Sequence, residues 1–374
     1  MVKLKRNVYK KEIINLEKIK NKIITISGEP ASGKSTVVKE IKSKYENEGY
    51  TVHIISVGDV FREMVKKEYL KKYPDRTNVS LADIQNDTEF MSKIHSIDSL
   101  VDSEVARKGK EINRAERPND VYIIDSRLAW NNVPDSYAIR LTVNDAIAGK
   151  RVFYDKTRGS EDQYETLDAA IQKTRKRKLG EIERYKERYN IDLSDENNYD
   201  LIVDTSYSNT TELADIIVKG EEAYRTGKAY PKHWASPTCF MPLQSVKNSK
   251  QPSASGNTIE SLAQKIQDEG YKTSEGVLKV TKRNGIRYLT KGLHRTFGAL
   301  SAGKTLLPYE VTTENTSSEP SLCEENILNY AEFIKHYSGE IGKSKQLQYF
   351  TADDLLAINN LLFTDLHKSI DTGR

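Results

Sequence analysis

The residues best suited to chemistry lie in one short stretch near the start of the chain, IITISGEPASGKST at residues 23–36. Gly28 and Gly33 allow the backbone to wrap so that N–H groups point at phosphate oxygens, and a following helix turns its positive end toward them. In this pattern Lys34 reaches the β- and γ-phosphates, while the Ser35 hydroxyl binds Mg²⁺. The spacing predicts a phosphate-binding P-loop with Mg²⁺ at its serine. The expected nucleotide-binding residues are Gly28, Glu29, Pro30, Ala31, Ser32, Gly33, Lys34, Ser35 and Thr36.

The segments around this loop have the order that the motif requires. Residues 23–26 are a β-branched run that predicts a buried strand, and residues 35–48 carry apolar side chains at helical spacing up to Gly49. A second stretch, GALSAGKT at residues 298–305, fits the same pattern of residue types. It follows a helical run and precedes the strand-like residues 306–311, so the order is inverted. We therefore reject it as a nucleotide site.

Strands and helices alternate over the first half of the chain. Further short apolar runs occur at residues 51–57, 121–125, 138–143 and 201–204, and helical patterns separate them. This alternation predicts an α/β fold with a doubly wound parallel sheet, which binds ligands outside the carboxyl ends of its strands.

Two polar clusters follow the second and third predicted strands. Arg62 in GDVFR suits bidentate binding of an acceptor phosphate, and Asp59 faces the same space; a helix N-cap and a surface arginine are the alternative for this pair. Asp125 ends a buried strand and suits the surroundings of Mg²⁺, while Arg127 suits the acceptor. The expected catalytic residues are Lys34, Asp59, Arg62 and Arg127, and the expected metal-binding residues are Ser35 and Asp125.

An arginine-rich, helical segment covers residues 151–188. Basic side chains on a mobile lid exclude water and offset charge on a phosphoryl group in transfer. We expect Arg158 and Arg184 to contact the nucleotide from this lid, and most of the other arginines to form a solvated helix face.

The composition sets bounds on partners and compartment. Lys and Arg number 58 against 54 Asp and Glu, so any nucleic-acid surface has to be local. The 2 cysteines lie far apart and the 6 histidines show no metal-ligand spacing with them, which predicts a reducing compartment without structural zinc. Neither a signal-peptide core nor an apolar run of about eighteen residues occurs, so we expect a cytoplasmic protein without a membrane partner.

The texture of the sequence changes near residue 228, where AYPKHWASPTCFMPL leads toward the polar stretch NSKQPSASGN. We expect a nucleotide-binding domain at residues 1–228, a smaller α+β domain at 229–312 and a helical extension at 313–374.

The motifs ITISGEPASGKST, VGDVFR, DSRLAW and ERYKERYNIDLSDENNYDLIVDTS resemble, in this order, the cytidylate kinase branch of the nucleoside monophosphate kinases. The resemblance covers about residues 22–220 and implies a P-loop kinase fold with ATP and Mg²⁺ on the donor side. It makes Arg62 and Arg127 acceptor-binding candidates and Arg184 and Arg188 lid or acceptor candidates. The segment KTRKRKLGEIERY departs from the family, which has acidic residues where Lys176 and Lys178 stand here.

Asp59 and Arg62 also resemble the acceptor motif of phage polynucleotide kinases, in which the aspartate is the general base for a hydroxyl. The chemistry separates the two resemblances. A nucleotide phosphate is already anionic and needs no base, whereas an alcohol gains from a carboxylate within hydrogen-bond reach.

Residues 240–311 resemble the ParB/sulfiredoxin-like domain, with a leading Pro-Leu strand, a β-hairpin, and Gly292-Leu-His-Arg295 opening a helix. In that family the Gly-x-x-Arg turn binds phosphate, of a nucleotide or near DNA, which agrees with helix-dipole physics. The alternative is that His294 and Arg295 only cap the helix.

Three hypotheses follow. The preferred one is a kinase that acts on DNA held by residues 229–312; it resembles the phage kinases that phosphorylate 5-hydroxymethyluracil in viral DNA, a step toward hypermodified thymidines, in the host cytoplasm. It uses both domains and gives Asp59 a task. The alternative is a cytidylate or deoxycytidylate kinase that acts on a free pyrimidine nucleotide. A non-catalytic, ParB-like partition protein ranks lower, because the acceptor-side arginines would have no task.

Overall fold

The computed structural model describes residues 21–312 apart from 77–78, 80–83, 85–86, 93–94, 116, 156–163, 243–251, 254 and 284–285. The side chains of Asp59 and Arg62, and those of residues 91–100, 241–242, 275, 283 and 286, also lie outside the description. The predicted helical extension at residues 313–374, and Arg158, fall outside the described residues as well.

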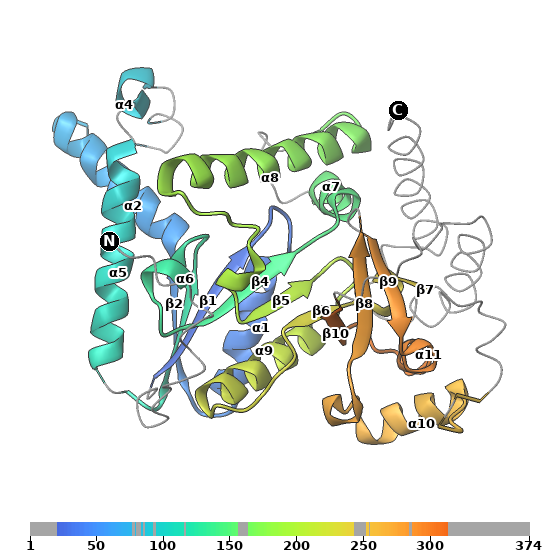
Figure 1. The fold of residues 1–374 in the computed structure, drawn as a ribbon. Coiled ribbons are helices and arrows are strands. Elements are labelled where there is room, and N and C mark those ends of the chain that lie inside the picture. The colour runs from blue at the N-terminus through green and yellow to red at the C-terminus, as the bar shows by residue number, and fades with distance from the viewer. Residues whose placement is uncertain are drawn as a thin grey trace.

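The first half of the chain alternates strands with helices, as predicted. Its elements are β1 (Lys22–Gly28), α1 (Lys34–Asn47), β2 (Thr51–Ser56), α2 (Val57–Lys72), α4 (Thr88–Ser92), α5 (His95–Arg114), β3 (Asp120–Asp125), α6 (Ala129–Asn132), β4 (Tyr137–Thr142), α7 (Asp145–Tyr154), α8 (Leu167–Tyr189), β5 (Leu201–Asp204) and α9 (Thr210–Arg225). The strands pair in parallel in the order β2-β3-β1-β4-β5. The predicted doubly wound α/β fold is therefore confirmed (Figure 1).

Side chains of β1 alternate between the two faces of the sheet, as the pleat of a strand requires. Ile24 and Ile26 are buried with the apolar stripe of α1, whereas Ile23 is buried with residues of α2 and α5. The stripe of α1 consists of Val37, Val38, Ile41 and Tyr45. Helices thus cover both faces, and the carboxyl ends of the parallel strands are left for ligands.

The second half of the chain adds its strands to the same sheet. Its elements are β6 (His233–Ala235), β7 (Phe240–Pro242), α10 (Ile259–Glu269), β8 (Leu278–Arg283), β9 (Ile286–Lys291), α11 (Leu293–Ser301) and β10 (Leu307–Val311). The order continues as β6-β10-β8-β9-β7, and β6 pairs in parallel with β5. The sheet therefore runs without a break past residue 228, where the change in sequence texture suggested a boundary.

Buried contacts also cross this position. Trp234 and Leu306 belong to the same apolar cluster as α1 and α9, and Val143 and Ile147 are buried with the apolar residues of β8 to β10. The described part of the chain therefore packs as one continuous α/β body.

The stretch at residues 298–305, which was rejected as a nucleotide site, has a structural role. Gly298 lies inside α11 and the stretch leads into β10, which is the inverted order expected from the sequence. The Thr305 hydroxyl accepts a hydrogen bond from the Asn209 backbone N–H at 2.7 Å and donates one to Glu212 at 2.7 Å. Thr305 thus fixes the start of α9.

Among the described residues, no helix combines the length and the apolar character needed to span a bilayer.

Candidate active site

The P-loop connects β1 to α1 with a backbone that suits an anion. Gly33 lies in the left-handed region with φ 79°, and α1 begins without a side-chain cap. A Cβ atom on Gly28 would lie 2.5 Å from Ser32 Oγ, so a side chain here would displace the Ser32 hydroxyl. Within the described part of the chain, the buried Ser32 Oγ has no hydrogen-bond partner. An uncapped helix start beside an unsatisfied hydroxyl fits a phosphate group.

A cavity of about 460 Å³ opens over this loop. It is lined by the backbone turn of residues 29–36 together with Arg127, Arg151, Asp155 and Arg177. Arg151 Nη1 donates to the Ala31 carbonyl at 3.0 Å, which ties helix α7 to the loop. Burial lowers the pKa of Arg151, although the charge of Asp204 opposes this.

Lys34 and Asp125 form an ion pair at the carboxyl ends of β1 and β3, which are neighbouring parallel strands. Their side chains are only 19% and 18% exposed. Burial lowers the pKa of Lys34, and the Asp125 carboxylate opposes this shift. The pairing places a cation and a carboxylate together at the mouth of the P-loop.

A second cavity, of about 440 Å³, adjoins the first and shares Lys34 and Arg127 with it. We call it the acceptor-side cavity. Its walls come from the β2–α2 junction, α5, the end of β3 and the last part of α8: Ser56, Val57, Gly58, Phe61, Val101, Asp102, Asp125, Ser126, Leu128, Arg184, Tyr185, Arg188 and Tyr189. Helix α8 crosses the carboxyl ends of the strands and so covers both cavities (Figure 1).

Arg127 stands between the two cavities and is held from α8. Its Nε donates to Glu181 Oε2 at 2.8 Å, and Glu181 also pairs with Arg177 at 3.4 Å. Burial lowers the pKa of Arg127, but the hydrogen bond and charge of Glu181 outweigh burial, so the net shift is upward. Arg127 therefore stays positively charged, and Glu181 holds its guanidinium in place through Nε.

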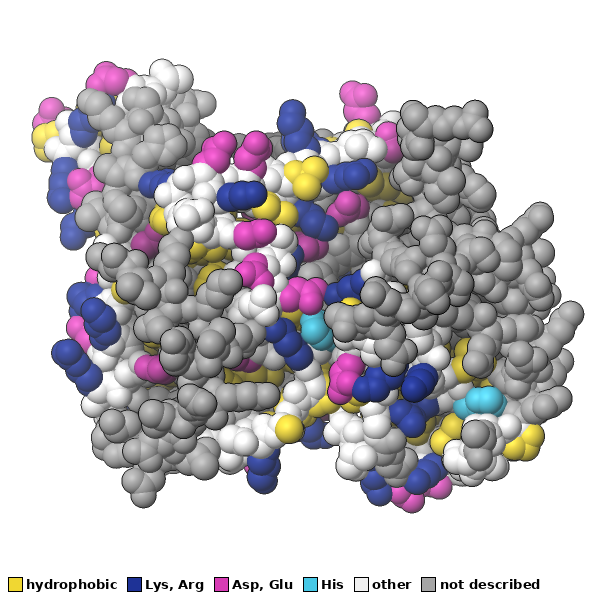
Figure 2. Space-filling view, in the orientation of Figure 1, with side chains coloured by type: hydrophobic (Ala, Val, Ile, Leu, Met, Phe, Trp, Pro, Cys, Tyr) yellow, Lys and Arg dark blue, Asp and Glu magenta, His cyan; other side chains and the backbone are white. Residues whose placement is uncertain are grey.

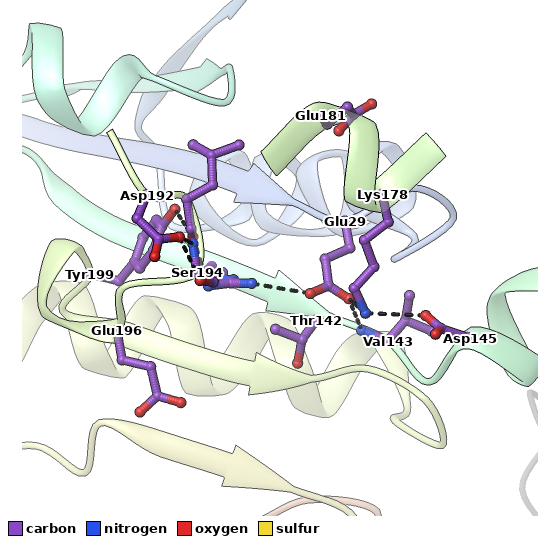
Figure 3. Close-up of polar contacts among 12 residues, drawn as sticks. Glu29, Thr142, Val143, Asp145, Lys178, Glu181, Asp192, Ser194, Glu196 and Tyr199 are labelled. Carbon is purple, nitrogen blue, oxygen red and sulfur yellow. Dashed lines mark hydrogen bonds and ion pairs between the residues drawn. The ribbon is translucent and has the colours of Figure 1, made fainter. Parts of the chain in front are cut away.

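Glu29, a predicted nucleotide-binding residue, has its carboxylate engaged within the protein. It accepts from Arg140 Nη2, from the Val143 backbone N–H and from Lys178 Nζ, each at 3.1 Å. Lys178 also contacts Asp145 at 3.1 Å, as Figure 3 shows. These contacts join the P-loop to β4, α7 and α8, and they occupy the carboxylate of Glu29 within the protein.

The other predicted site residues lie on α2 and α8. Arg184, expected to contact the nucleotide from the lid and also an acceptor candidate by the resemblance, lines the acceptor-side cavity and is absent from the described lining of the P-loop cavity. Asp59 and Arg62 lie on α2 beside the cavity-lining Gly58 and Phe61, with their side chains outside the description. Arg151 and Asp102 were missed, because nothing local distinguishes them from other charged helical residues.

Comparison with known proteins agrees with this geometry. Residues 27–167 match the family described as an AAA domain, AAA_17. The chain is 31% identical over 202 residues to the cytidylate kinase of Methanococcus vannielii, covering 98% of that protein and 53% of this chain. Identity to the cytidylate kinase of Methanocella arvoryzae is 29%, covering 95% of it and 53% of this chain, and identity to that of Methanocaldococcus jannaschii is 30%, covering 88% and 49%.

These relatives are covered almost completely by about half of this chain. The P-loop, the paired Lys34 and Asp125, and two adjoining cavities are the parts that a phosphotransferase with ATP and Mg²⁺ needs. The chain therefore belongs to the cytidylate kinase family of P-loop kinases.

Proposed function

We propose that the protein is a nucleoside monophosphate kinase that transfers the γ-phosphoryl group of ATP to a free pyrimidine nucleotide, CMP or dCMP. The observation that carries this proposal is the meeting of two cavities at Lys34 and Arg127. Direct transfer requires donor and acceptor phosphates side by side, with water excluded, and adjoining cavities under one helix supply that arrangement.

On the donor side, the backbone of residues 29–36 and the Lys34 ammonium would hold the phosphates of ATP. Mg²⁺, which accompanies ATP in such kinases, offsets negative charge on the phosphates. The Ser35 hydroxyl and the Asp125 carboxylate offer the oxygen ligands that Mg²⁺ prefers. Lys34 then leaves its pairing with Asp125 for the phosphates, where it stabilises charge on the group in transfer.

On the acceptor side, Arg127 and Arg184 would bind the phosphate of the nucleotide. A guanidinium pairs with two phosphate oxygens in a fork, which aligns one oxygen for attack. The attacking oxygen is already anionic, so no general base is required.

The comparisons favour this reading over phosphorylation of a base within DNA. The matched relatives are named cytidylate kinases, and they correspond to the half of the chain that contains both cavities. On the face drawn in Figure 2, the described Lys and Arg side chains are interspersed with Asp and Glu along α8. Such mixing gives little of the continuous basic surface that a nucleic acid needs.

One experiment separates the two acceptors. Radiolabelled ATP is supplied with CMP, dCMP and UMP in one set of reactions and with 5-hydroxymethyluracil-containing DNA in another. We expect label in CDP and dCDP, with a rate that depends only weakly on salt. Label in DNA, with a rate that falls steeply as salt releases phosphate contacts, would contradict the proposal and restore the DNA reading.

A further cavity, of about 430 Å³, supports a phosphate-binding role for the ParB-like region as a second proposal. It is lined by the Gly292–Arg295 turn together with Lys291 and polar residues of 253–257. Gly292 has φ 108°, and α11 begins without a side-chain cap. We expect Arg295→Ala to weaken binding of nucleotide or DNA to this region in a filter-binding assay while CMP phosphorylation persists.

A further inference from the structure

The acceptor-side cavity has two chemically different ends. Lys34 and Arg127 also line the P-loop cavity, so their end is next to the donor phosphates. Phe61, Val101 and Asp102 line the acceptor-side cavity, but they are not among the described residues over the P-loop. Among the described lining residues of α2 and α5, this second end is apolar apart from the carboxylate of Asp102. It is the end left for the base of a nucleotide.

The wall opposite α5 is aromatic and basic. The rings of Tyr185 and Tyr189 stack with centroids 5.6 Å apart. Arg188 lies over the Tyr189 ring at 5.4 Å. Asp102 lines the same cavity as these two rings. Burial raises the pKa of the Tyr185 hydroxyl, the charges of Arg184 and Arg127 oppose this, and the Asp102 carboxylate adds to the rise. Flat rings opposite apolar side chains suit a nucleobase, and the polar groups then read its edge.

A carboxylate only accepts hydrogen bonds, and an arginine only donates them. The edge of cytosine carries an amino donor at N4 beside acceptors at N3 and O2, so Asp102 and Arg188 complement it. Uracil carries a carbonyl oxygen in place of the amino group, which would bring two acceptors together against Asp102. The pairing of a carboxylate with the cytosine amino group is the usual one in protein recognition of this base.

We propose that Asp102 is a specificity-determining residue of the acceptor site and selects a base with an exocyclic amino group over uracil. This inference rests on the proposed function, because it assumes that a nucleoside monophosphate fills the acceptor-side cavity. It assigns a task to α5, a helix on which the sequence motifs place no functional residue.

The test compares kcat/KM for CMP and UMP in the full chain, in Asp102→Asn and in Glu104→Gln. Asn keeps the size of the side chain but adds an N–H donor that can serve the uracil carbonyl. Glu104 provides the matched control, since it is a carboxylate on the same helix that pairs with Arg107 outside the cavity. We expect the CMP-to-UMP ratio to fall about 10-fold or more in Asp102→Asn, as for loss of one good base contact, and to stay unchanged in Glu104→Gln.

A substrate-side measurement keeps the inference testable if Asp102→Asn fails to fold. The unaltered protein is given CMP and its analogue with a 2-pyrimidinone base, which lacks the amino group. Weaker binding of the analogue, about 10-fold by calorimetry, agrees with the inference. Equal binding of the two nucleotides contradicts it.

The outcomes separate this inference from the function on which it rests. If the full chain phosphorylates no nucleoside monophosphate, the proposed function fails and the inference fails with it. If the full chain prefers CMP and a folded Asp102→Asn variant keeps the same ratio, only the assignment of Asp102 is wrong.

Discussion

At the scale of single residues, we expect substitution of Lys34 to cause the largest loss of activity. Lys34→Ala should lower kcat by about 10²–10³-fold, because the lysine stabilises charge on the transferring phosphate and lies at the junction of both cavities. The fold should survive, since the side chain pairs with Asp125 at the rim and not with the apolar core. Circular dichroism and turnover assays check this, with Lys39→Ala on the exposed side of α1 as control. Near-normal turnover in a folded Lys34→Ala protein would exclude the P-loop as the catalytic site.

Arg127 should affect the acceptor more than the donor. In Arg127→Ala the acceptor phosphate loses a guanidinium that Glu181 holds in place at 2.8 Å. We expect KM for CMP to rise about 10- to 100-fold with a much smaller change in KM for ATP. The matched control is Arg107→Ala, which removes an exposed guanidinium on α5. Equal effects on the two substrates would contradict a role of Arg127 that is mainly on the acceptor side.

At the scale of elements, the approach of α7 to α8 depends on one glycine. A Cβ atom on Gly149 would lie 2.4 Å from Ile171 Cγ1 and 2.7 Å from its Cα, so the backbone of α8 would have to move. Gly149→Ala should therefore lower Tm by several degrees and raise KM for ATP, because α8 carries Arg177 into the lining of the P-loop cavity and pairs Lys178 with Glu29 of the loop.

Gly180 provides the matched control on α8 itself. Nothing lies within 4 Å of a Cβ atom placed there, so Gly180→Ala should stabilise the protein by about 0.4–1 kcal/mol. Thermal denaturation of both variants compares the two sites directly. If both substitutions shift Tm in the same direction, α7 and α8 do not pack as closely as the structure shows.

The elements that carry the chemistry could be predicted because their signals are local. The run at residues 23–36 encodes strand, loop and helix in adjacent residues, and Asp125 follows directly from the buried strand before it. Gly149, Asp102 and the carboxylate of Glu29 were not predictable in this way. Their contacts join segments that are far apart in sequence, so no pattern of neighbouring residues distinguishes them from ordinary helical glycines and carboxylates.

At the scale of the whole molecule, the extent of the sheet was the feature hardest to foresee. Strand β6 is three residues long, His233–Ala235, and a run this short has no recognisable period. It nevertheless pairs with β5 on one side and β10 on the other, and so joins the two halves of the chain. The amino-acid composition changes near residue 228, but the sheet continues across this position without a break.

The seam between the halves contains a buried ion pair whose loss should affect the whole fold. Arg287 on β9 contacts Asp204 at the end of β5 at 2.9 Å, with side chains only 19% and 9% exposed. Burial raises the pKa of Asp204, but the charge of Arg287 and the hydrogen bonds from Ser206 and Arg287 together outweigh burial, so the net shift is downward. Arg287→Ala would leave a buried carboxylate without its cation, which costs about 3–5 kcal/mol in such cases.

We expect Arg287→Ala to lower Tm in a single calorimetric transition, since the two halves share a sheet and buried clusters.

The stabilisation by this ion pair should also depend on pH, in one direction only. Because Asp204 has a lowered pKa in the folded state, the pair stabilises the fold above the unfolded pKa of about 4, and this contribution is lost as pH falls further. The difference in Tm between the full chain and Arg287→Ala should thus be largest at neutral pH and shrink in acid. Lys279→Ala, which removes an exposed pair with Glu310, should show neither effect. Two separate transitions in Arg287→Ala, with the higher one unchanged, would mean that the kinase half is stable by itself and that the continuous sheet does not couple the halves.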